Sequence, residues 1–383
     1  MSRFLVLGAG KMGSVMAKDL VESNSRNIVT LVDISSIQLK RAERFIRSKR
    51  LKTIQMDVED KKKREEIFDG RDAALAALLH RHSLLALDAA VRKGIHFVDA
   101  VGEKPLERLR YDSAAKKKRI TLISGVGVSP GITNICLGRA VHLLDETEKA
   151  MIYVGGNPIH PRPPLNYRIV YAVNSVLNFY QREVQILKKG KIKKVQPLSG
   201  LEPINFASFP EMECFYTDGL SSLLYTMKGR IKDELFEKTI RHKGHAQGVK
   251  TLKECGLFSR QPVLLGGEKV IPREFLEALL DSKMKLGREK DATLLRIIVS
   301  GKKSGKPVTH VFEMVDFYDS KRNYTSMAKT TSLPASISAQ MVASGRIRRR
   351  GSLFPEDVFQ AELYEPFMEG LKKRGVIVNH KII

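Results

Sequence analysis

Three glycines near the start of the chain have the spacing of a turn that approaches phosphate groups. Gly8, Gly10 and Gly13 follow an apolar stretch and precede a segment with helical periodicity. The first glycine allows a sharp turn, the second lets backbone N–H groups approach a pyrophosphate, and the third lets the helix pack closely on its strand. The N–H groups of Lys11 and Met12 begin a helix whose positive end faces the phosphates. This pattern predicts a dinucleotide site.

An acidic residue stands where such a site needs one. Asp33 ends a second apolar stretch, 28–32, about twenty residues after Gly13, and a carboxylate there accepts hydrogen bonds from the adenosine ribose. A structural turn followed by a solvent-facing Asp is the alternative, but strand, glycines, helix and acid occur in the order of the dinucleotide-binding pattern. No arginine within 34–36 can receive a 2′-phosphate, so we expect NAD as the cofactor. Asp57, after a third apolar stretch, is expected near the adenine end or as the cap of the next helix.

The elements that must position these residues alternate between strand and helix over residues 1–125. Apolar strand-like stretches, separated by helical segments, are expected at 4–7, 28–32, 53–56, 72–79, 95–98 and 120–124. This alternation predicts a Rossmann-type doubly wound parallel sheet, an α/β fold. The glycine-rich stretch 125–131 breaks the alternation and is expected to lead into another domain.

A second domain is expected over residues 126–330. Its strands alternate apolar with polar residues, which favours an α+β domain with a mixed sheet, and they are expected at 150–154, 168–172, 292–299 and 309–317. Helical periodicity returns in 331–383, and we expect these helices to complete the first domain. The second sheet is also expected to pair subunits, so we predict a homo-oligomer, either a dimer or a tetramer.

Composition argues against several other classes of protein. The three cysteines of this 383-residue chain have no CxxC spacing and no matching histidine pattern, which argues against a metal site and for a reducing compartment. We recognise no targeting segment and no membrane-spanning run, so we expect a cytoplasmic protein without a membrane partner. The net charge of +24 is dispersed along a chain without tryptophan, which favours solvated surfaces over a nucleic-acid partner.

Several blocks in the middle of the chain have a recognisable sequence. They are 153–158 (YVGGNP), 163–167 (PPLNY), 215–219 (FYTDG), 238–245 (KTIRHKGH) and 327–330 (MAKT). These blocks resemble the saccharopine dehydrogenase-like superfamily and, within it, the lysine 6-dehydrogenases, and the resemblance covers nearly the whole chain. It implies a two-domain oxidoreductase in which NAD accepts a hydride from the ε-carbon of L-lysine, and in which the imine is then hydrolysed to the semialdehyde and ammonia.

The amino-acid substrate implied by this resemblance needs a cation for its carboxylate. A guanidinium is the best bidentate partner of a carboxylate, so Arg241 is our candidate, with a surface ion pair to Glu237 as the alternative. His245 is expected to be either a second polar contact or a structural hydrogen-bonding residue. Ser129 and Pro130 match the loop of the superfamily at the domain junction and are expected to shape the pocket.

Two residues at strand ends are candidates for handling the proton of the substrate amine. The amine must be neutral when hydride leaves, whereas a free lysine amine has a pKa of about 10.4, so a base is required. Asp99 ends the strand 95–98 beside the expected nicotinamide crevice, where it would hold the ammonium or relay its proton unless it caps the next helix. His80 would face the same crevice as a base or lie exposed in a loop, and here the chain departs from its relatives, which tend to carry an aromatic residue.

Two other functions stay open at this point. A saccharopine dehydrogenase-type reductase acting on a secondary amine would hold two amino-acid moieties and would need further cations in its cleft. A nucleotide-sensing or nucleic-acid-binding protein on a Rossmann scaffold is favoured only by the net charge.

Overall fold

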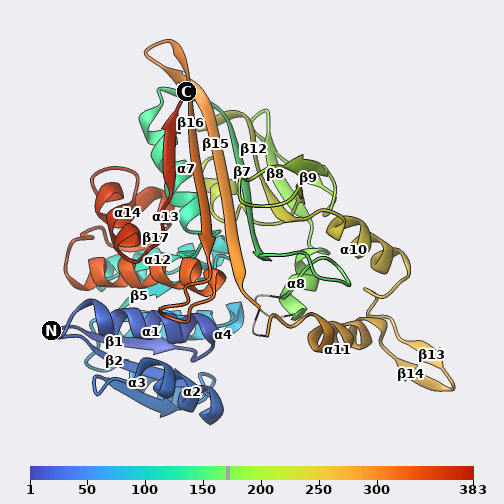
Figure 1. Cartoon of the computed structure of the whole chain (residues 1–383). Coiled ribbons are helices and arrows are strands. Elements are labelled where there is room, and N and C mark those ends of the chain that lie inside the picture. The colour runs from blue at the N-terminus through green and yellow to red at the C-terminus, as the bar shows by residue number, and fades with distance from the viewer. Residues whose placement is uncertain (170–172, 288) are drawn as a thin grey trace.

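The computed structural model describes residues 1–169, 173–287 and 289–383, which form two large sheets (Figure 1). The first sheet is parallel and has the order β17-β6-β5-β4-β1-β2-β3, which confirms the predicted Rossmann-type sheet. Its strands are β1 (Arg3–Leu7), β2 (Ile28–Asp33), β3 (Leu51–Gln55), β4 (Ala73–Ala76), β5 (His96–Asp99), β6 (Thr121–Ser124) and β17 (Gly351–Leu353).

The central strand β1 of this parallel sheet is buried on both faces. Phe4 and Val6 of β1 belong to one hydrophobic cluster, and the alternating residues Leu5 and Leu7 belong to another. A strand that is buried on both faces reads as a continuous apolar run, which is why the strands of this domain could be located from the sequence. The helices of the N-terminal half are α1 (Lys11–Ser23), α2 (Ser36–Ile46), α3 (Lys61–Ile67), α4 (His80–Lys93), α5 (Pro105–Leu109), α6 (Asp112–Lys117) and α7 (Ile132–Leu143).

The glycine turn joins β1 to α1 with very little space. Gly8 has φ of 100°, a backbone conformation that favours glycine. A Cβ atom added to Gly13 would lie 1.7 Å from the carbonyl oxygen of Gly8, so this position accepts no side chain. The third glycine therefore has the close-packing role that the sequence pattern predicts.

The second sheet is mixed, as predicted. Strands β12 and β7 pair in parallel, whereas their other neighbours are antiparallel, and the main path runs β10-β11-β12-β7-β15-β16-β18 with β8 and β9 beside β12. The strands are β7 (Glu146–Pro158), β8 (Val184–Lys188), β9 (Lys191–Val195), β10 (Glu202–Ile204), β11 (Met212–Tyr216), β12 (Ile231–His242), β15 (Asp291–Lys303), β16 (Lys306–Phe317) and β18 (Asn379–Ile382). Of the strand predicted at 168–172, residues 170–172 lie outside the described residues.

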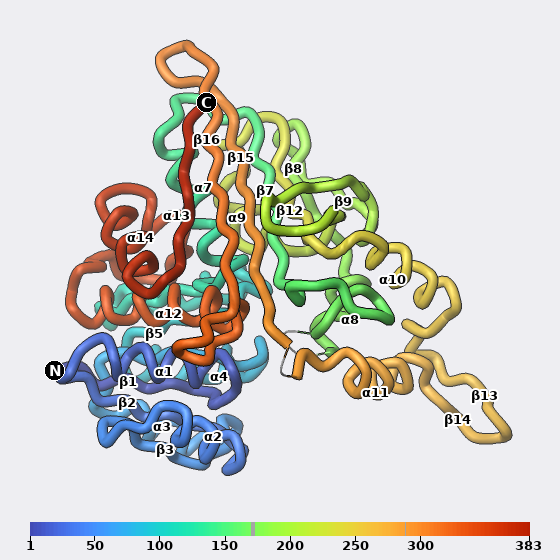
Figure 2. Tube along the Cα trace, viewed as in Figure 1, coloured from blue at the N-terminus to red at the C-terminus, as the bar shows by residue number. Residues whose placement is uncertain are grey.

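A smaller helical layer and a hairpin extend the second domain. Figures 1 and 2 show α11 and the hairpin of β13 and β14 projecting away from the two sheets. These elements are α8 (Val173–Phe179), α9 (Leu223–Thr226), α10 (His245–Glu254), β13 (Val263–Leu265), β14 (Glu268–Val270) and α11 (Pro272–Met284).

The C-terminal segment returns to the first domain through α12 (Ser326–Ala343), α13 (Pro355–Val358) and α14 (Tyr364–Lys373). Asp19 of α1 accepts hydrogen bonds from Ser336 Oγ and Arg374 Nε, both at 2.6 Å, and these contacts join α1 to the C-terminal helices. The predicted boundary needs a correction, because 331–383 also contains strands: β17 extends the first sheet, and β18 pairs with β16 of the second. The last strand thereby links the two domains.

Candidate functional site

The glycine turn and Asp33 lie together at the carboxyl edge of the first sheet. Asp33 Oδ2 accepts a hydrogen bond from the N–H of Ala9 at 2.6 Å, and its Oδ1 accepts one from Ser35 at 2.8 Å. Helix α1 has no side-chain cap and no acidic residue in its first turn, and open space surrounds the Cβ position of Gly10. An uncapped helix start next to a glycine turn suits an anionic pyrophosphate, so these residues fit a dinucleotide.

Three further residues predicted at the cofactor site lie in or near the first helices of the chain. Lys11 is exposed at the first position of α1, and the carbonyl of Met12 accepts a hydrogen bond from Ser332 of α12 at 2.9 Å. Asp57 is exposed and accepts a hydrogen bond from the N–H of Glu59, whereas Asp60 caps α3. The alternative role of Asp57 as the helix cap is therefore wrong.

A cavity of about 540 Å³ lies where the two domains meet. The first domain contributes the loop 102–105, and the junction contributes Ser129 and Pro130, which are expected from the sequence to shape the pocket. The second domain contributes residues of β7, the loop after β11, and Glu237, Thr239 and Arg241 of β12.

Strand β12 presents three polar side chains to this pocket. Glu237, Thr239 and Arg241 are alternate residues of one strand, so their side chains emerge on the same face. At about 3.3 Å per residue, the Cα atoms of Glu237 and Arg241 are roughly 13 Å apart. An acidic group and a guanidinium therefore stand at opposite ends of one polar face.

Glu237 is a buried acid with one hydrogen-bond donor beside it. Its side chain is almost fully buried, and Ser129 Oγ donates a hydrogen bond to its Oε2 at 2.6 Å. Burial raises the pKa of Glu237 to about 7, the hydrogen bond from Ser129 opposes this rise, and the charge of Asp218 adds to it. A Cβ atom on Gly219 would lie 1.7 Å from Glu237 Oε1, so a glycine is needed to leave room for the carboxylate. A carboxyl group that titrates near neutral pH can act as a general base.

Arg241 is held in place by aromatic residues. It is buried, its Nε donates to Tyr180 Oη at 3.2 Å, and its guanidinium carbon lies 4.5 Å from the centre of the Tyr167 ring. Its Nη1 donates to the carbonyl of Ile240 at 2.8 Å. A guanidinium fixed in this way at the wall of a pocket can bind a carboxylate.

His245 supports Arg241 instead of lining the pocket. Its Nδ1 donates to the carbonyl of Leu165 and its Nε2 accepts from Tyr180 Oη, both at 2.8 Å. Burial lowers the pKa of His245 to about 3, so the ring is neutral at physiological pH. Among the residues described, His245 is not part of the pocket wall, and the structural hydrogen bond, our alternative for it, is what the structure contains.

Asp99, predicted as a catalytic residue, is enclosed by protein. Its carboxylate has no exposed surface, lies 2.6 Å from Arg108 Nη1, and accepts hydrogen bonds from Ser83 Oγ and the N–H of Val101. Burial raises the pKa of Asp99, and Arg108 opposes this rise. Because three groups already surround the carboxylate, direct contact with a substrate is not supported, and Asp99 instead fixes the end of β5.

His80, the second predicted catalytic residue, also lies outside the described pocket wall. It starts α4, and its Nε2 lies 3.1 Å from Glu107 Oε2. The hydrogen bond from His80 lowers the pKa of Glu107. His80 is therefore part of a contact between α4 and α5, and it is partly buried rather than exposed in a loop.

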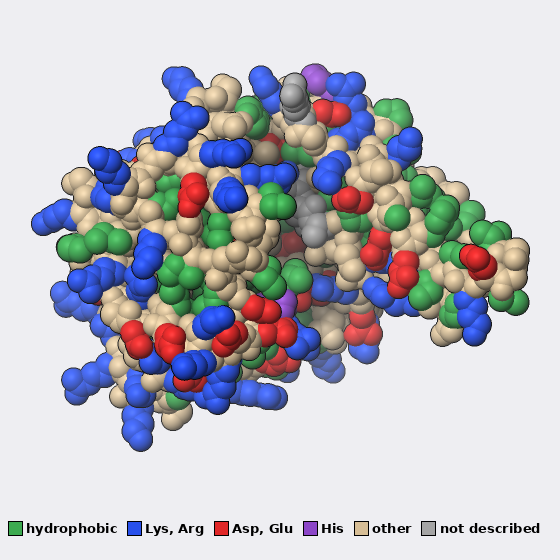
Figure 3. All heavy atoms as spheres, turned by 90° about the horizontal axis from the view of Figure 1, so that it is seen from below, with side chains coloured by type: hydrophobic (Ala, Val, Ile, Leu, Met, Phe, Trp, Pro, Cys, Tyr) green, Lys and Arg blue, Asp and Glu red, His purple; other side chains and the backbone are tan. Residues whose placement is uncertain are grey.

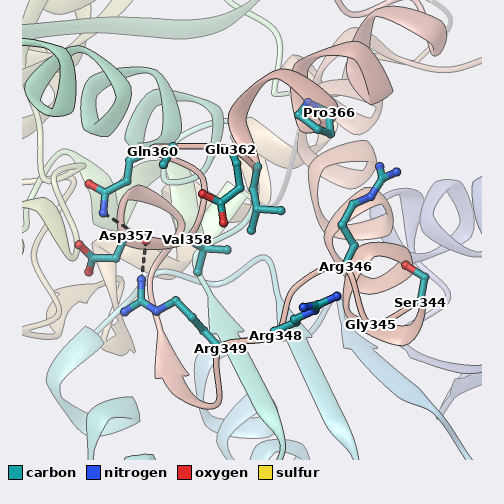
Figure 4. A pocket seen from close by; sticks show the side chains of 12 residues that line it. Ser344, Gly345, Arg346, Arg348, Arg349, Asp357, Val358, Gln360, Glu362 and Pro366 are labelled. Carbon is teal, nitrogen blue, oxygen red and sulfur yellow. Dashed lines mark hydrogen bonds between the residues drawn. The ribbon is translucent and has the colours of Figure 1, made fainter.

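A larger cavity, of about 870 Å³, lies within the C-terminal segment (Figure 4). Arg346, Arg348 and Arg349 line it together with Asp357 and Glu362, and Arg349 donates to the carbonyl of Asp357 at 2.6 Å. Neither the glycine turn nor the β12 face contributes to its wall. The smaller pocket between the domains is therefore the candidate active site.

Other kinds of site find no support in the part of the chain that the structure describes. No group of three or more His, Cys, Asp or Glu side chains there is arranged to bind a metal ion, and no described helix is long and apolar enough to span a bilayer. Figure 3 shows Lys and Arg spread over the visible face among acidic side chains instead of gathered in one patch.

A Rossmann-type domain, a mixed-sheet domain and a polar pocket between them define a two-domain dehydrogenase. The saccharopine dehydrogenase NADP-binding domain matches residues 4–123, and the saccharopine dehydrogenase C-terminal domain matches residues 127–376. The chain therefore belongs to the saccharopine dehydrogenase family, as its sequence blocks predicted. The NAD prediction is not confirmed, because the matched domain is described as binding NADP.

Known relatives match over nearly the whole chain. The NADP⁺-dependent, L-glutamate-forming saccharopine dehydrogenase of Schizosaccharomyces pombe is 23% identical and covers 100% of this chain and 99% of its own. Carboxyaminopropylagmatine dehydrogenase of Synechocystis is 22% identical, over 98% and 96% respectively. The mitochondrial α-aminoadipic semialdehyde synthase of Rattus norvegicus is 21% identical, but the match covers only 47% of that longer protein.

One solved structure has the same fold over both domains. The apo form of L-glutamate-forming saccharopine dehydrogenase from Saccharomyces cerevisiae superposes with a TM-score of 0.84, at 20% identity, over 100% of both chains.

Proposed function

We propose that the protein oxidises the ε-carbon of L-lysine, with NAD as the hydride acceptor, and releases ammonia and the semialdehyde. Membership of the saccharopine dehydrogenase family supports a dehydrogenase of amines or amino acids. The choice of the ε-carbon rests on the placement of Glu237 and Arg241 along β12.

The distance between Glu237 and Arg241 fits a substrate that reacts at the end remote from its carboxylate. An extended lysine measures roughly 8 Å from carboxylate oxygen to Nζ, with carbon–carbon bonds of about 1.5 Å. With a hydrogen bond of about 2.8 Å at either end, such a substrate has a length of the same order as the roughly 13 Å between the Cα atoms of Glu237 and Arg241, whose side chains both line the pocket. A substrate that reacts at its α-carbon would need the base and the guanidinium much closer together.

Different residues of the pocket would bind the substrate and transfer its proton. Arg241 would bind the substrate carboxylate, and Glu237 would take a proton from the ε-ammonium, since the amine must be neutral before it is oxidised. Ser129 would orient the Glu237 carboxylate through its hydrogen bond. The nicotinamide, when bound, accepts the hydride from the ε-carbon. Water then adds to the iminium carbon, one of its protons passes to the nitrogen, and the C–N bond breaks to release ammonia and the semialdehyde. The remaining proton of that water and the proton held by Glu237 pass to solvent, so that Glu237 is ionised again for the next turnover.

A secondary amine is the second candidate substrate, and the relatives favour it. Two of them are named for saccharopine and carboxyaminopropylagmatine. Arg182 at the mouth of the pocket is a further cation, of the kind that a second amino-acid moiety would need, although Glu103 lies 2.8 Å from it.

The purified protein should form NADH from L-lysine with one ammonia released per NADH. The assay compares lysine, saccharopine and ornithine, each with NAD and with NADP, and measures absorbance at the nicotinamide band together with ammonia. Turnover of saccharopine but not of lysine would show that the substrate is a secondary amine and would contradict the lysine assignment. NADH without ammonia would point to an alcohol or another donor.

The preference for NAD should depend on Asp33. Its carboxylate would accept hydrogen bonds from the ribose hydroxyls and repel a 2′-phosphate, and residues 34–36 offer no cation in return. Replacing Asp33 with Ser should therefore weaken NAD binding and decrease the preference for NAD over NADP, measured as the ratio of their kcat/KM values. If the unmodified protein turns over NADP as well as NAD, the cofactor assignment is wrong.

A further inference from the structure

Asp218 is a second carboxylate in the pocket, and it has no fixed partner. It lies in the loop after β11 and lines the same cavity as Glu237. Within residues 1–169, 173–287 and 289–383 it makes no hydrogen bond and no ion pair. Its carboxylate is accessible from the pocket although protein surrounds much of it, and this burial raises its pKa.

Asp218 stands at the Glu237 end of the pocket. A Cβ atom on its neighbour Gly219 would lie 1.7 Å from Glu237 Oε1, and the charge of Asp218 raises the pKa of Glu237. Arg241, on the same strand as Glu237, is roughly 13 Å further along β12. The two carboxylates are therefore at the end where the substrate amine would be held.

The remaining charges around Asp218 are paired with one another. Ion pairs at the mouth of the pocket join Arg182 to Glu103 at 2.8 Å, Lys104 to Glu107 at 3.3 Å, and Glu183 to Lys194 at 2.9 Å. Arg182 partly lowers the pKa of Asp218, and Glu103 raises it. Apart from Arg241 at the far end of β12, the charges left in the inner pocket are those of the two carboxylates, Asp218 and Glu237, and a cation bound from solution would relieve their repulsion.

We propose that Asp218 is a catalytic residue that balances the positive charge of the substrate nitrogen, first as ammonium and then as iminium. The inference rests on the proposed function, because it takes the substrate to be an amine. It also assigns different tasks to the two carboxylates of the pocket.

Proton and electron transfer explain why one carboxylate is insufficient. Glu237 takes a proton from the ammonium, so that an N–H bond breaks and the Glu237 acid becomes neutral. The C–H bond of the ε-carbon then breaks, its electron pair leaves with the hydrogen to the oxidised nicotinamide, and the nitrogen lone pair forms the C=N bond. The product is an iminium cation next to a neutral Glu237. In its ionised form Asp218 would stabilise this charge, as preorganised charges do in other active sites.

Replacement of Asp218 with Asn tests this role without changing the size of the side chain. We expect kcat for lysine oxidation to fall by about 10²-fold, the size of effect seen when one charge-stabilising group is removed. Because the charge of Asp218 raises the pKa of Glu237, the acid limb of the pH–rate profile should also move to lower pH. Glu183→Gln is the matched control: it removes a carboxylate of the same pocket that is already paired with Lys194, and kcat should change less than twofold.

Binding provides a readout that does not need turnover. In the presence of NADH, the unmodified protein should bind L-lysine more tightly than L-norleucine, which lacks the ε-amine. Calorimetry should show that Asp218→Asn lowers the ratio of the two dissociation constants about tenfold. If the preference depends on Asp218 but no substrate is oxidised, the cation site stands and the proposed function fails.

Two results would overturn the inference while leaving the proposed function intact. One is an Asp218→Asn protein whose kcat stays within twofold of the parent at every pH. The other is an unchanged preference for lysine over norleucine. If Asp218→Asn does not fold, the same binding comparison is made with Asp218→Glu, which keeps the charge. Loss of the preference for lysine in a folded Asp218→Glu protein would contradict a charge-based role.

Discussion

Replacing Glu237 with Gln is expected to lower kcat for lysine oxidation by about 10²- to 10⁴-fold, the usual contribution of a general base. The amide keeps the shape of the side chain and can still accept the hydrogen bond from Ser129, but it cannot take a proton from the ammonium. NAD affinity should change little, because the glycine turn and Asp33 belong to the other sheet. Steady-state kinetics with lysine saturating and NAD varied measure both kcat and the KM for NAD, with Glu183→Gln as the control.

The pH dependence identifies Glu237 as the base more sharply than the loss of rate does. Oxidation needs the ionised form of Glu237, whose pKa is raised to about 7 by burial. The activity of the parent should therefore rise with pH through about 7, and this limb should be absent from the residual activity of Glu237→Gln. A variant that keeps the limb at pH 7 would mean that another group takes the proton.

Stability offers a check that holds even if the variant is inactive. The pKa of Glu237 is raised from about 4.3 in the unfolded chain to about 7 in the native protein, so the native state binds the proton more tightly. The stability that this group contributes is present below about pH 4.3 and is lost as pH rises through 7. Urea unfolding above pH 8 should therefore find Glu237→Gln at least as stable as the parent.

The cofactor region could be predicted because its signals are local. The spacing of Gly8, Gly10 and Gly13, and the acid at Asp33, are set by one strand, one turn and one helix, so the chain places them without help from distant segments. The continuous apolar runs of the parallel strands located the first sheet for the same reason.

Distant segments decide the surroundings of the residues predicted to be catalytic. Asp99 does end a parallel strand, as predicted, but Arg108 and Ser83 from two helices close over its carboxylate. A strand-end rule places a residue at the edge of a sheet and cannot show which side chains cover it. In the same way, no local sequence pattern indicated that β18, at the end of the C-terminal segment, would pair with β16 of the second sheet.

Glu237 had a sequence signal that was read as something else. Glu237 stands four residues before Arg241 in a strand, so period-two alternation places both side chains on the same face of the strand. If Arg241 lines the pocket, Glu237 is therefore expected to line it as well. From the sequence alone, Glu237 is expected only as a surface partner of Arg241. Its hydrogen bond with Ser129, 108 residues away in the chain, and the glycine that makes room for it are visible only in the fold.

Replacing Arg241 with Ala should raise the KM for lysine by roughly 10- to 150-fold, the equivalent of about 1.5–3 kcal/mol for a hydrogen bond to a charged group. The guanidinium is the buried cation at the far end of the β12 face, and Tyr180 and Tyr167 hold it there. NAD affinity should be unchanged. Arg182→Ala, at the mouth and already paired with Glu103, is the control and should change the KM for lysine far less. A large effect of Arg182→Ala on saccharopine alone would instead favour the secondary amine.

A substrate without a carboxylate separates a binding role of Arg241 from a structural one. Cadaverine has the amine and the carbon chain of lysine but nothing for a guanidinium to bind, so the parent should prefer lysine by the same factor that the variant loses. Arg241→Ala should therefore oxidise cadaverine about as well as the parent does, while its preference for lysine disappears. If both substrates are impaired equally, Arg241 maintains the shape of the pocket and does not bind the carboxylate. Because the carboxylate lies far from the reacting carbon in our proposal, kcat should fall much less than KM rises.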